Sequence, residues 1–136
     1  MNKFKTVTSI IFNDFEQVLM QLRDNKTERC PNMWCFPGGY IEPGENPIET
    51  AIRETEEEYG LKFEANDFEE LMTHELPFGG NSEIFICKLK DNQIPILNEG
   101  AEMRWMSIDE IKKLELGFEH EKIIPKLEEF LLKRNK

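Results

Sequence analysis

The sequence has no long hydrophobic run and little cysteine, and both absences narrow its class. No apolar stretch within the 136 residues approaches the roughly 20 residues that a membrane-spanning helix needs, so we expect no membrane partner. The N-terminal stretch MNKFKTVTSIIFND is briefly apolar but has no small-residue cleavage site, which predicts that it is not a signal peptide. The 3 cysteines match no zinc or redox spacing and predict reduced thiols in a cytoplasmic protein.

Positive charge is scarce as well. The chain has 17 Lys and Arg residues against 27 Asp and Glu residues, which gives a net charge of −10. This balance argues against a role in binding nucleic acid through its phosphate backbone. It does not argue against a small phosphate substrate, because a bound metal ion reverses the sign of the charge locally. The length and the ordinary hydrophobic content predict one folded domain over residues 1–136.

The stretch from Gly38 to Leu61, GGYIEPGENPIETAIRETEEEYGL, is the most acidic part of the chain, with 7 glutamates against 1 arginine. Its Gly-Gly start predicts a loop. A helix is expected to follow, with Asn46 as N-cap, Pro47 at the first helical position and Glu49 as the reciprocal capping residue. Gly60 is the predicted stop.

On a helical wheel this segment has two distinct faces. The predicted buried face consists of Ile48, Ala51, Ile52, Thr55 and Tyr59. Glu54, Glu57 and Glu58 share a separate arc near the C-terminal end of the helix, where the helix dipole also disfavours anions. A divalent cation would offset this repulsion, and all-oxygen ligands favour Mg²⁺ or Mn²⁺. The plain alternative, left open at this point, is a solvated acidic surface.

A longer spacing joins these residues into one pattern. The stretch reads G-x5-E-x7-R-E-U-x-E-E-x-G-U, where U is a bulky aliphatic residue, at Gly39, Glu45, Arg53, Glu54, Glu57, Glu58, Gly60 and Leu61. This pattern resembles the signature of the Nudix hydrolases. The one departure is Thr55, which stands where an aliphatic residue is usual. Because it lies on the buried face, its methyl group can pack and its hydroxyl can bond back to the helix backbone.

The resemblance implies a fold and a chemistry. The fold would be an α/β fold of the Nudix type, an α/β/α sandwich with a mixed β-sheet between helices. The chemistry would be Mg²⁺- or Mn²⁺-dependent hydrolysis of a pyrophosphate bond in a nucleoside diphosphate linked to another group. A MutT-like hydrolase of nucleoside triphosphates is the expected branch. The alternatives are a pyrophosphatase for nucleotide sugars, ADP-ribose or dinucleoside polyphosphates, and a non-catalytic nucleotide sensor. A homodimer is open, since Nudix dimers are frequent.

The resemblance also implies roles for residues of the motif. Metal ligands are expected at Glu54, Glu57, Glu58 and the carbonyl of Gly38. Structural support of the site is expected from Gly39, Glu45 and Arg53.

Residues outside the motif complete the expected site. Arg23, at the junction of a predicted strand and a polar loop, is expected to contact substrate phosphate, although a solvated loop arginine is an equal alternative. Glu102 is the preferred further metal ligand or general base, with Glu99 as second choice. Glu54 is the other candidate for orienting or deprotonating the attacking water.

The remaining segments have simpler interpretations. Strands are predicted at residues 5–12, 17–22, 68–76 and 83–89, a helix after Ser107, and a C-terminal helix over 119–133 that Pro125 either kinks or begins. His74 and His120 are expected to be surface or hydrogen-bonded histidines. Trp34 and Phe36 are expected to pack under the acidic helix or to line a base pocket, with core packing favoured for one of them.

Overall fold

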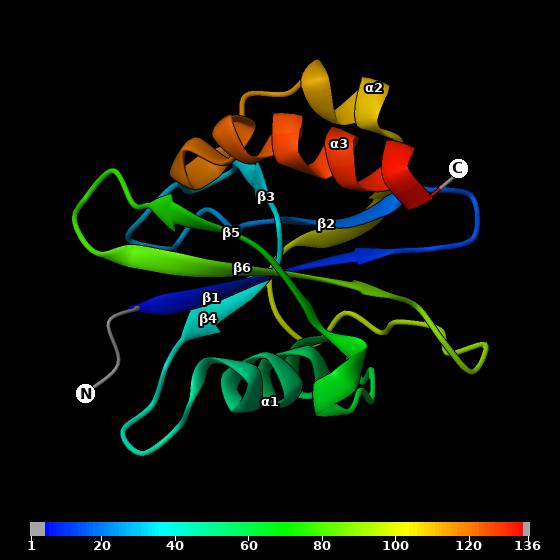
Figure 1. Ribbon diagram of the computed structural model, residues 1–136. Coiled ribbons are helices and arrows are strands. Elements are labelled where there is room, and N and C mark those ends of the chain that lie inside the picture. The colour runs from blue at the N-terminus through cyan, green and yellow to red at the C-terminus, as the bar shows by residue number, and fades with distance from the viewer. Residues whose placement is uncertain (1–4, 135–136) are drawn as a thin grey trace.

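In the computed structural model, which describes residues 5–134, seven strands form one mixed sheet between two layers of helices (Figure 1). The strands are β1 (Thr6–Phe12), β2 (Val18–Leu22), β3 (Trp34–Cys35), β4 (Gly38–Tyr40), β5 (Glu69–Glu75), β6 (Asn81–Lys88) and β7 (Glu102–Met106). β1 and β6 run parallel, and every other pairing in the sheet is antiparallel. The expected sandwich with a mixed sheet is therefore confirmed.

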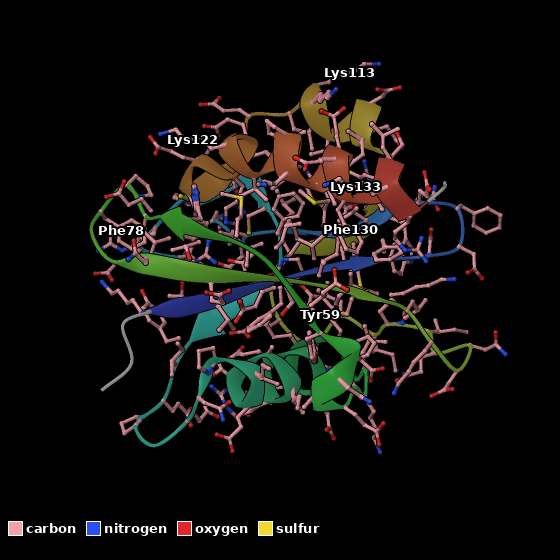
Figure 2. All side chains as sticks on the ribbon, in the orientation of Figure 1. Tyr59, Phe78, Lys113, Lys122, Phe130 and Lys133 are labelled. Carbon is pink, nitrogen blue, oxygen red and sulfur yellow. The ribbon has the colours of Figure 1, made fainter. Side chains whose placement is uncertain are left out.

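The helical layers bury two separate cores. Helix α1 (Pro47–Tyr59) lies on one face of the sheet, and α2 (Ile108–Lys112), η2 (Gly117–Ile123) and α3 (Ile124–Arg134) lie on the other. Figure 2 shows Tyr59 between α1 and the sheet, and Phe130 between α3 and the sheet. Each layer buries one apolar side of the same strands, as alternation along a strand requires. A short 3₁₀ turn, η1 (Ala65–Asp67), leads from α1 toward β5.

Helix α1 begins and ends as its sequence predicts. The Asn46 side chain accepts from the Glu49 N–H, the Glu49 side chain accepts from the Asn46 N–H, and Pro47 is the first helical residue. Gly60 ends the helix in the left-handed conformation with a φ of 66°. The Thr55 hydroxyl donates to the Ala51 carbonyl oxygen at 2.9 Å, so the one departure from the motif is accommodated inside the helix.

The chain from 38 to 40 differs from the prediction. Gly38 and Gly39 are not in a loop but in strand β4, which pairs with β1. Neither glycine has a positive φ. They are needed because a Cβ at Gly38 would collide with the backbone oxygen of Val7, and a Cβ at Gly39 would collide with the Glu54 carboxylate.

The C-terminal segment also differs from the prediction of a single helix over 119–133. Phe118 and Glu119 have φ values of 58° and 56°, and this left-handed backbone cannot continue a right-handed helix. Residues 117–123 therefore form the separate 3₁₀ segment η2. Pro125 is the second residue of α3, so it begins that helix and does not kink it.

The two aromatic residues before the glycines do not lie under α1. Phe36 is buried in the core on the α3 face, and Trp34 packs against the same core with the Arg104 guanidinium 5.2 Å from its ring centroid. The expectation that one of them is a core residue is correct, but the core is the one on the opposite side of the sheet from the acidic helix. Within residues 5–134, no helix has the length and the apolar composition that crossing a membrane requires.

Candidate active site

A cleft of about 640 Å³ is lined by residues of α1 on one face of the sheet and of η2 on the other. Its two sides differ in chemistry. We call one side the acidic wall, which consists of Glu42, Glu54, Glu57, Glu58 and Glu99. We call the other side the aromatic wall, which consists of Arg23, Arg29, Phe78, Phe118 and His120.

Arg53 links the acidic wall to the start of the motif. Its Nε and Nη2 donate to the two carboxylate oxygens of Glu45 at 2.7 and 2.9 Å. Its Nη1 donates to Glu54 Oε1 at 2.8 Å and to Glu57 Oε2 at 3.2 Å, and Nη2 also donates to the Tyr40 carbonyl at 3.1 Å. One half-buried guanidinium thus holds three carboxylates and the end of β4, as the i, i+4 spacing to Glu57 predicts.

Glu45 is fixed more tightly than the rest of the loop. Hydrogen bonds from Arg53, from the Glu42 N–H and from the Thr50 hydroxyl lower the pKa of its carboxyl group to about 2. The carboxylate therefore stays charged well below the usual pKa of a glutamate, and it orients Arg53 toward the acidic wall.

Glu58 is the least ordinary carboxyl group of the site. Its side chain is buried, and burial together with a hydrogen bond to Glu54 and the nearby charges of Glu54 and Glu99 raises its pKa to about 10. Its Oε2 is buried without a hydrogen-bond partner in the structure. A buried carboxyl oxygen with no partner is energetically unfavourable, which makes this side chain a candidate ligand for a bound ion or water molecule.

Gly39 explains how Glu54 fits. A Cβ at residue 39 would lie 2.5 Å from Glu54 Oε1 and 2.6 Å from Oε2. The Glu54 carboxylate therefore occupies the space that a side chain at residue 39 would fill. Gly39 thus allows the Glu54 carboxylate to approach the backbone of β4 closely.

Of the two candidate glutamates from the later loop, the structure brings one to the cleft. Glu102 lies on β7, where its half-exposed carboxylate pairs with Arg104 at 3.2 Å, and it does not line the cleft. Glu99 lines the cleft. Its loop is held in place because the Asn98 N–H donates to the Glu58 carbonyl oxygen and the Gln21 side chain donates to the Glu99 carbonyl oxygen. The preferred residue Glu102 therefore lies outside the cleft and the second choice, Glu99, lies in it; which of them acts stays a prediction.

Arg23 lies in the cleft and is not a solvated loop arginine. Its Nε donates to the Arg29 carbonyl oxygen at 2.9 Å, and its Cζ lies 5.0 Å from the Phe118 ring centroid. Two of the five residues of the aromatic wall have no sequence signal, because Phe78 and Phe118 stand in segments without hydrophobic periodicity. The only local clue is the Gly79-Gly80 turn that follows Phe78.

The two histidines are hydrogen-bonded, as expected. His74 Nε2 donates to the Phe118 carbonyl oxygen at 2.8 Å. His120 Nδ1 accepts from the Phe36 N–H at 3.1 Å, and full burial lowers the pKa of its ring to about 3. His120 is therefore neutral at physiological pH and supports the cleft as a structural residue.

The oxygen donors of the acidic wall are of the type that binds a hard divalent ion, but they do not converge on one point in the structure. Within the described part of the chain, no three His, Cys, Asp or Glu side chains are grouped so that they could hold a metal ion. Arg53 satisfies Glu54 and Glu57 instead, and Glu58 has the unpartnered oxygen. Oxygen ligands and an incomplete buried carboxyl group are what Mg²⁺ or Mn²⁺ binds.

Comparison with known proteins gives a consistent picture. The family model described as NUDIX domain matches residues 3–127. The human protein called nucleoside diphosphate-linked moiety X motif 6 is 30% identical over 115 residues, which are 80% of this chain and 36% of that protein. The rat asymmetrical bis(5'-nucleosyl)-tetraphosphatase is 32% identical over 88 residues, which are 60% of each chain.

A solved structure agrees in fold. The MutT/nudix family protein from Enterococcus faecalis superposes with a TM-score of 0.78 at 20% identity, over 98% of this chain and 64% of that one. The present chain thus spans about a third of the length of the human relative and three fifths of the rat enzyme.

Proposed function

This chain belongs to the NUDIX domain family, and from that premise we propose that it hydrolyses a pyrophosphate bond in a nucleoside diphosphate linked to another group. The observation that carries the proposal is the acidic wall, where Glu54, Glu57 and Glu58 line one cleft and Arg53 links two of them to Glu45. The cleft volume of about 640 Å³ suits a nucleotide.

We assign the expected metal ligands to Glu54, Glu57, Glu58 and the Gly38 carbonyl. A divalent ion bound there supplies charge neutralisation for the diphosphate and acidifies a water molecule. Glu99 replaces Glu102 as the further carboxylate, because only Glu99 lines the cleft. Glu54 or Glu99 orients the attacking water and accepts its proton.

Two cations have different tasks in this proposal. Arg53 fixes the orientation of Glu54 and Glu57 and does not contact the substrate. Arg23, which lines the cleft with its guanidinium beside Phe118, binds a substrate phosphate from the opposite wall. The charge of the substrate is then balanced from both sides of the cleft.

The substrate branch that we propose is a single nucleoside triphosphate, as for a MutT-like enzyme. A second candidate is a dinucleoside polyphosphate, which the identity to the rat tetraphosphatase favours. We further propose that residues 1–136 act as one catalytic domain with a small-molecule partner. Cytoplasmic location agrees with three cysteines that form no disulfide, and the net charge of −10 agrees with the absence of a nucleic-acid partner. A homodimer stays a prediction that light scattering tests.

The experiment is a substrate panel with Mg²⁺, in which released phosphate, pyrophosphate and nucleoside monophosphate are measured. The panel contains the common and oxidised nucleoside triphosphates, ADP-ribose, a nucleotide sugar and diadenosine tetraphosphate. Turnover of any member supports the enzyme, and binding without turnover supports a sensor.

Variants of the acidic wall decide whether turnover belongs to this site. Glu57→Gln and Glu58→Gln should each lose roughly 10²-fold or more in kcat, the usual size of such contributions. Glu56→Gln is the matched control, because this exposed residue lies on the same helix and does not line the cleft. Near wild-type turnover in either of the first two variants would remove the metal assignment.

A further inference from the structure

Three segments that are distant in the sequence meet at the aromatic wall. Arg29 comes from the loop after β2, Phe78 from the turn between β5 and β6, and Phe118 from η2. Phe78 lies at the edge of the sheet where β5 turns into β6 (Figure 2). The three side chains contact one another in a fixed order, because Arg29 covers Phe78 and Phe78 packs against Phe118.

The contact between Arg29 and Phe78 has the geometry of a stack. The Arg29 Cζ lies 3.6 Å from the centroid of the Phe78 ring, which is the separation of two planar groups in van der Waals contact. Arg29 is exposed and Phe78 is half-buried. The exposed guanidinium plane thus lies over the half-buried ring, and its displacement would open one face of the ring to another flat molecule.

The inner part of the wall is held by backbone bonds. Phe118 has a φ of 58°, a conformation that residues with side chains rarely adopt and that persists only where the surroundings impose it. His74 Nε2 donates to the Phe118 carbonyl oxygen at 2.8 Å, and the Phe118 N–H donates to Cys30 Sγ at 3.3 Å. The Phe118 ring meets the Phe78 ring edge to face at 5.9 Å and 69°, so the strained turn fixes one edge of Phe78.

The outer part is held by its backbone alone. The Arg29 carbonyl oxygen accepts from Arg23 Nε at 2.9 Å and from the Thr27 hydroxyl at 3.1 Å. The next residue, Cys30, accepts the hydrogen bond from the Phe118 N–H through its Sγ. The main chain at Arg29 is therefore fixed beside Phe118, while its side chain has only the Phe78 ring as its described partner.

The distribution of charge along the cleft determines which end of a ligand lies at which wall. Glutamates line the acidic wall, whereas the other side has arginines and aromatic rings, with the two carboxylates of Asp24 and Glu28 beside them. A nucleotide has phosphates that bind metal ions at one end and a flat, neutral base at the other. The base end matches the stack of Arg29 and Phe78, since both stacking on an aromatic ring and contact with a guanidinium plane are common ways to bind a base.

We propose that Phe78 is the platform on which the nucleotide base stacks, that Arg29 covers the other face of the base, and that Phe118 fixes the platform. This assignment rests on the proposed function, because it names the base end of the same cleft. It makes the preferred substrate a purine nucleotide, since the larger ring system stacks over more of the platform.

The test is calorimetric binding of AMP, GMP, CMP and ribose 5-phosphate to the whole protein with Mg²⁺. None of these probes contains a pyrophosphate bond, so binding is measured without turnover. Phe78→Leu keeps apolar volume but removes the ring, and Phe78→Tyr keeps the ring. Phe15→Leu is the matched control, because Phe15 is 84% exposed in the turn between β1 and β2.

We expect Phe78→Leu to weaken AMP and GMP binding roughly 5- to 100-fold, the range for loss of one base–aromatic stack. Binding of ribose 5-phosphate should change less than about twofold, and Phe78→Tyr should restore purine binding. Phe15→Leu should match the wild type. Equal weakening of all four probes in Phe78→Leu, or wild-type AMP binding in that variant, would overturn the proposal, as would a wild type that binds ribose 5-phosphate as well as AMP.

The outcome is separable from that of the proposed function. If AMP binding depends on Phe78 but no nucleotide is hydrolysed, the base platform stands and the hydrolase does not. If turnover depends on Glu57 while Phe78→Leu leaves KM and AMP affinity unchanged, the hydrolase stands and the platform is overturned.

Discussion

The two walls of the cleft are held together by different means. In the acidic wall, side chains are joined to one another through Arg53, which contacts Glu45, Glu54 and Glu57. In the aromatic wall, the main chain is fixed by bonds at Phe118 and Arg29, and the side chains lie on top of this frame.

This difference predicts different responses to substitution. Where several charged groups share one cation, the loss of one member leaves the others unsatisfied, so the effect spreads through the wall. Where side chains rest on a fixed main chain, a change in one ring alters the fit of a ligand and leaves its neighbours in place. The acidic wall should therefore govern rate, and the aromatic wall should govern preference among substrates.

The largest effect should come from removing the shared cation. Arg53→Ala should lower kcat on the true substrate roughly 10²- to 10³-fold, because carboxylates that must be held in position lose their common partner. Arg53→Lys should recover little, since an ammonium group cannot reach all these oxygens at once. Steady-state kinetics measures both. Near wild-type kcat in Arg53→Lys would show that only charge matters, and not the forked contact.

A slightly smaller effect should follow from filling the space at Gly39. In Gly39→Ala the new methyl group would displace the Glu54 carboxylate, and kcat should fall by about 10²-fold, as for a misplaced catalytic group. Gly38→Ala is the matched comparison. There the methyl group meets the Val7 main chain, so the melting temperature should fall. Loss of stability without loss of kcat in Gly39→Ala would break the link between this glycine and Glu54.

The extent of the acidic wall beyond the motif is tested by a pair of variants. Glu99→Gln should lower kcat roughly 10- to 100-fold, the range for an outer group that tunes a metal site. Glu102→Gln should stay within about twofold of wild type, because that carboxylate pairs with Arg104 outside the cleft. The reverse order of effects would restore Glu102 to the site.

The smallest expected effect is the pH dependence of the free energy of unfolding that comes from His120, which supports the aromatic wall. Burial holds the His120 pKa at about 3, so below its ordinary value of 6.5 the unfolded chain binds a proton that the folded chain does not. The contribution of His120 to stability should therefore fall as pH drops from 6.5 toward 3, by about 2 kcal/mol at pH 5, while Glu58, whose pKa is raised, contributes in the opposite direction over this range. Urea unfolding at pH 7 and pH 5 measures it.

A control separates this histidine from the acidic wall. In His120→Asn the side-chain oxygen can still accept from the Phe36 N–H, but no proton is bound, so the loss that His120 contributes between pH 7 and pH 5 should be absent. The difference from the wild type isolates this loss from the opposite contribution of Glu58. Glu45 titrates elsewhere, since its lowered pKa of about 2 makes its contribution disappear only below its ordinary value of 4.5. An equal loss in His120→Asn would assign the effect to another group.

The sequence alone determined the acidic helix and most of its wall. The caps at Asn46 and Gly60, the back-bonded Thr55 and the contact from Arg53 to Glu57 all lie within one helical segment, where a fixed rise and turn per residue sets the distances. The main strands were predictable within about two residues for a similar reason, because alternation is a local property.

The tertiary structure decided what the helix faces. It buried Glu58, it placed Asn98 against the end of α1, and it brought Glu99, and not Glu102, to the cleft. It also assembled the aromatic wall, whose bonds join residues 44 and 88 positions apart, from His74 to Phe118 and from Cys30 to Phe118. Such contacts depend on how strands pair and where loops cross the sheet edge, and no periodicity within a short segment encodes that.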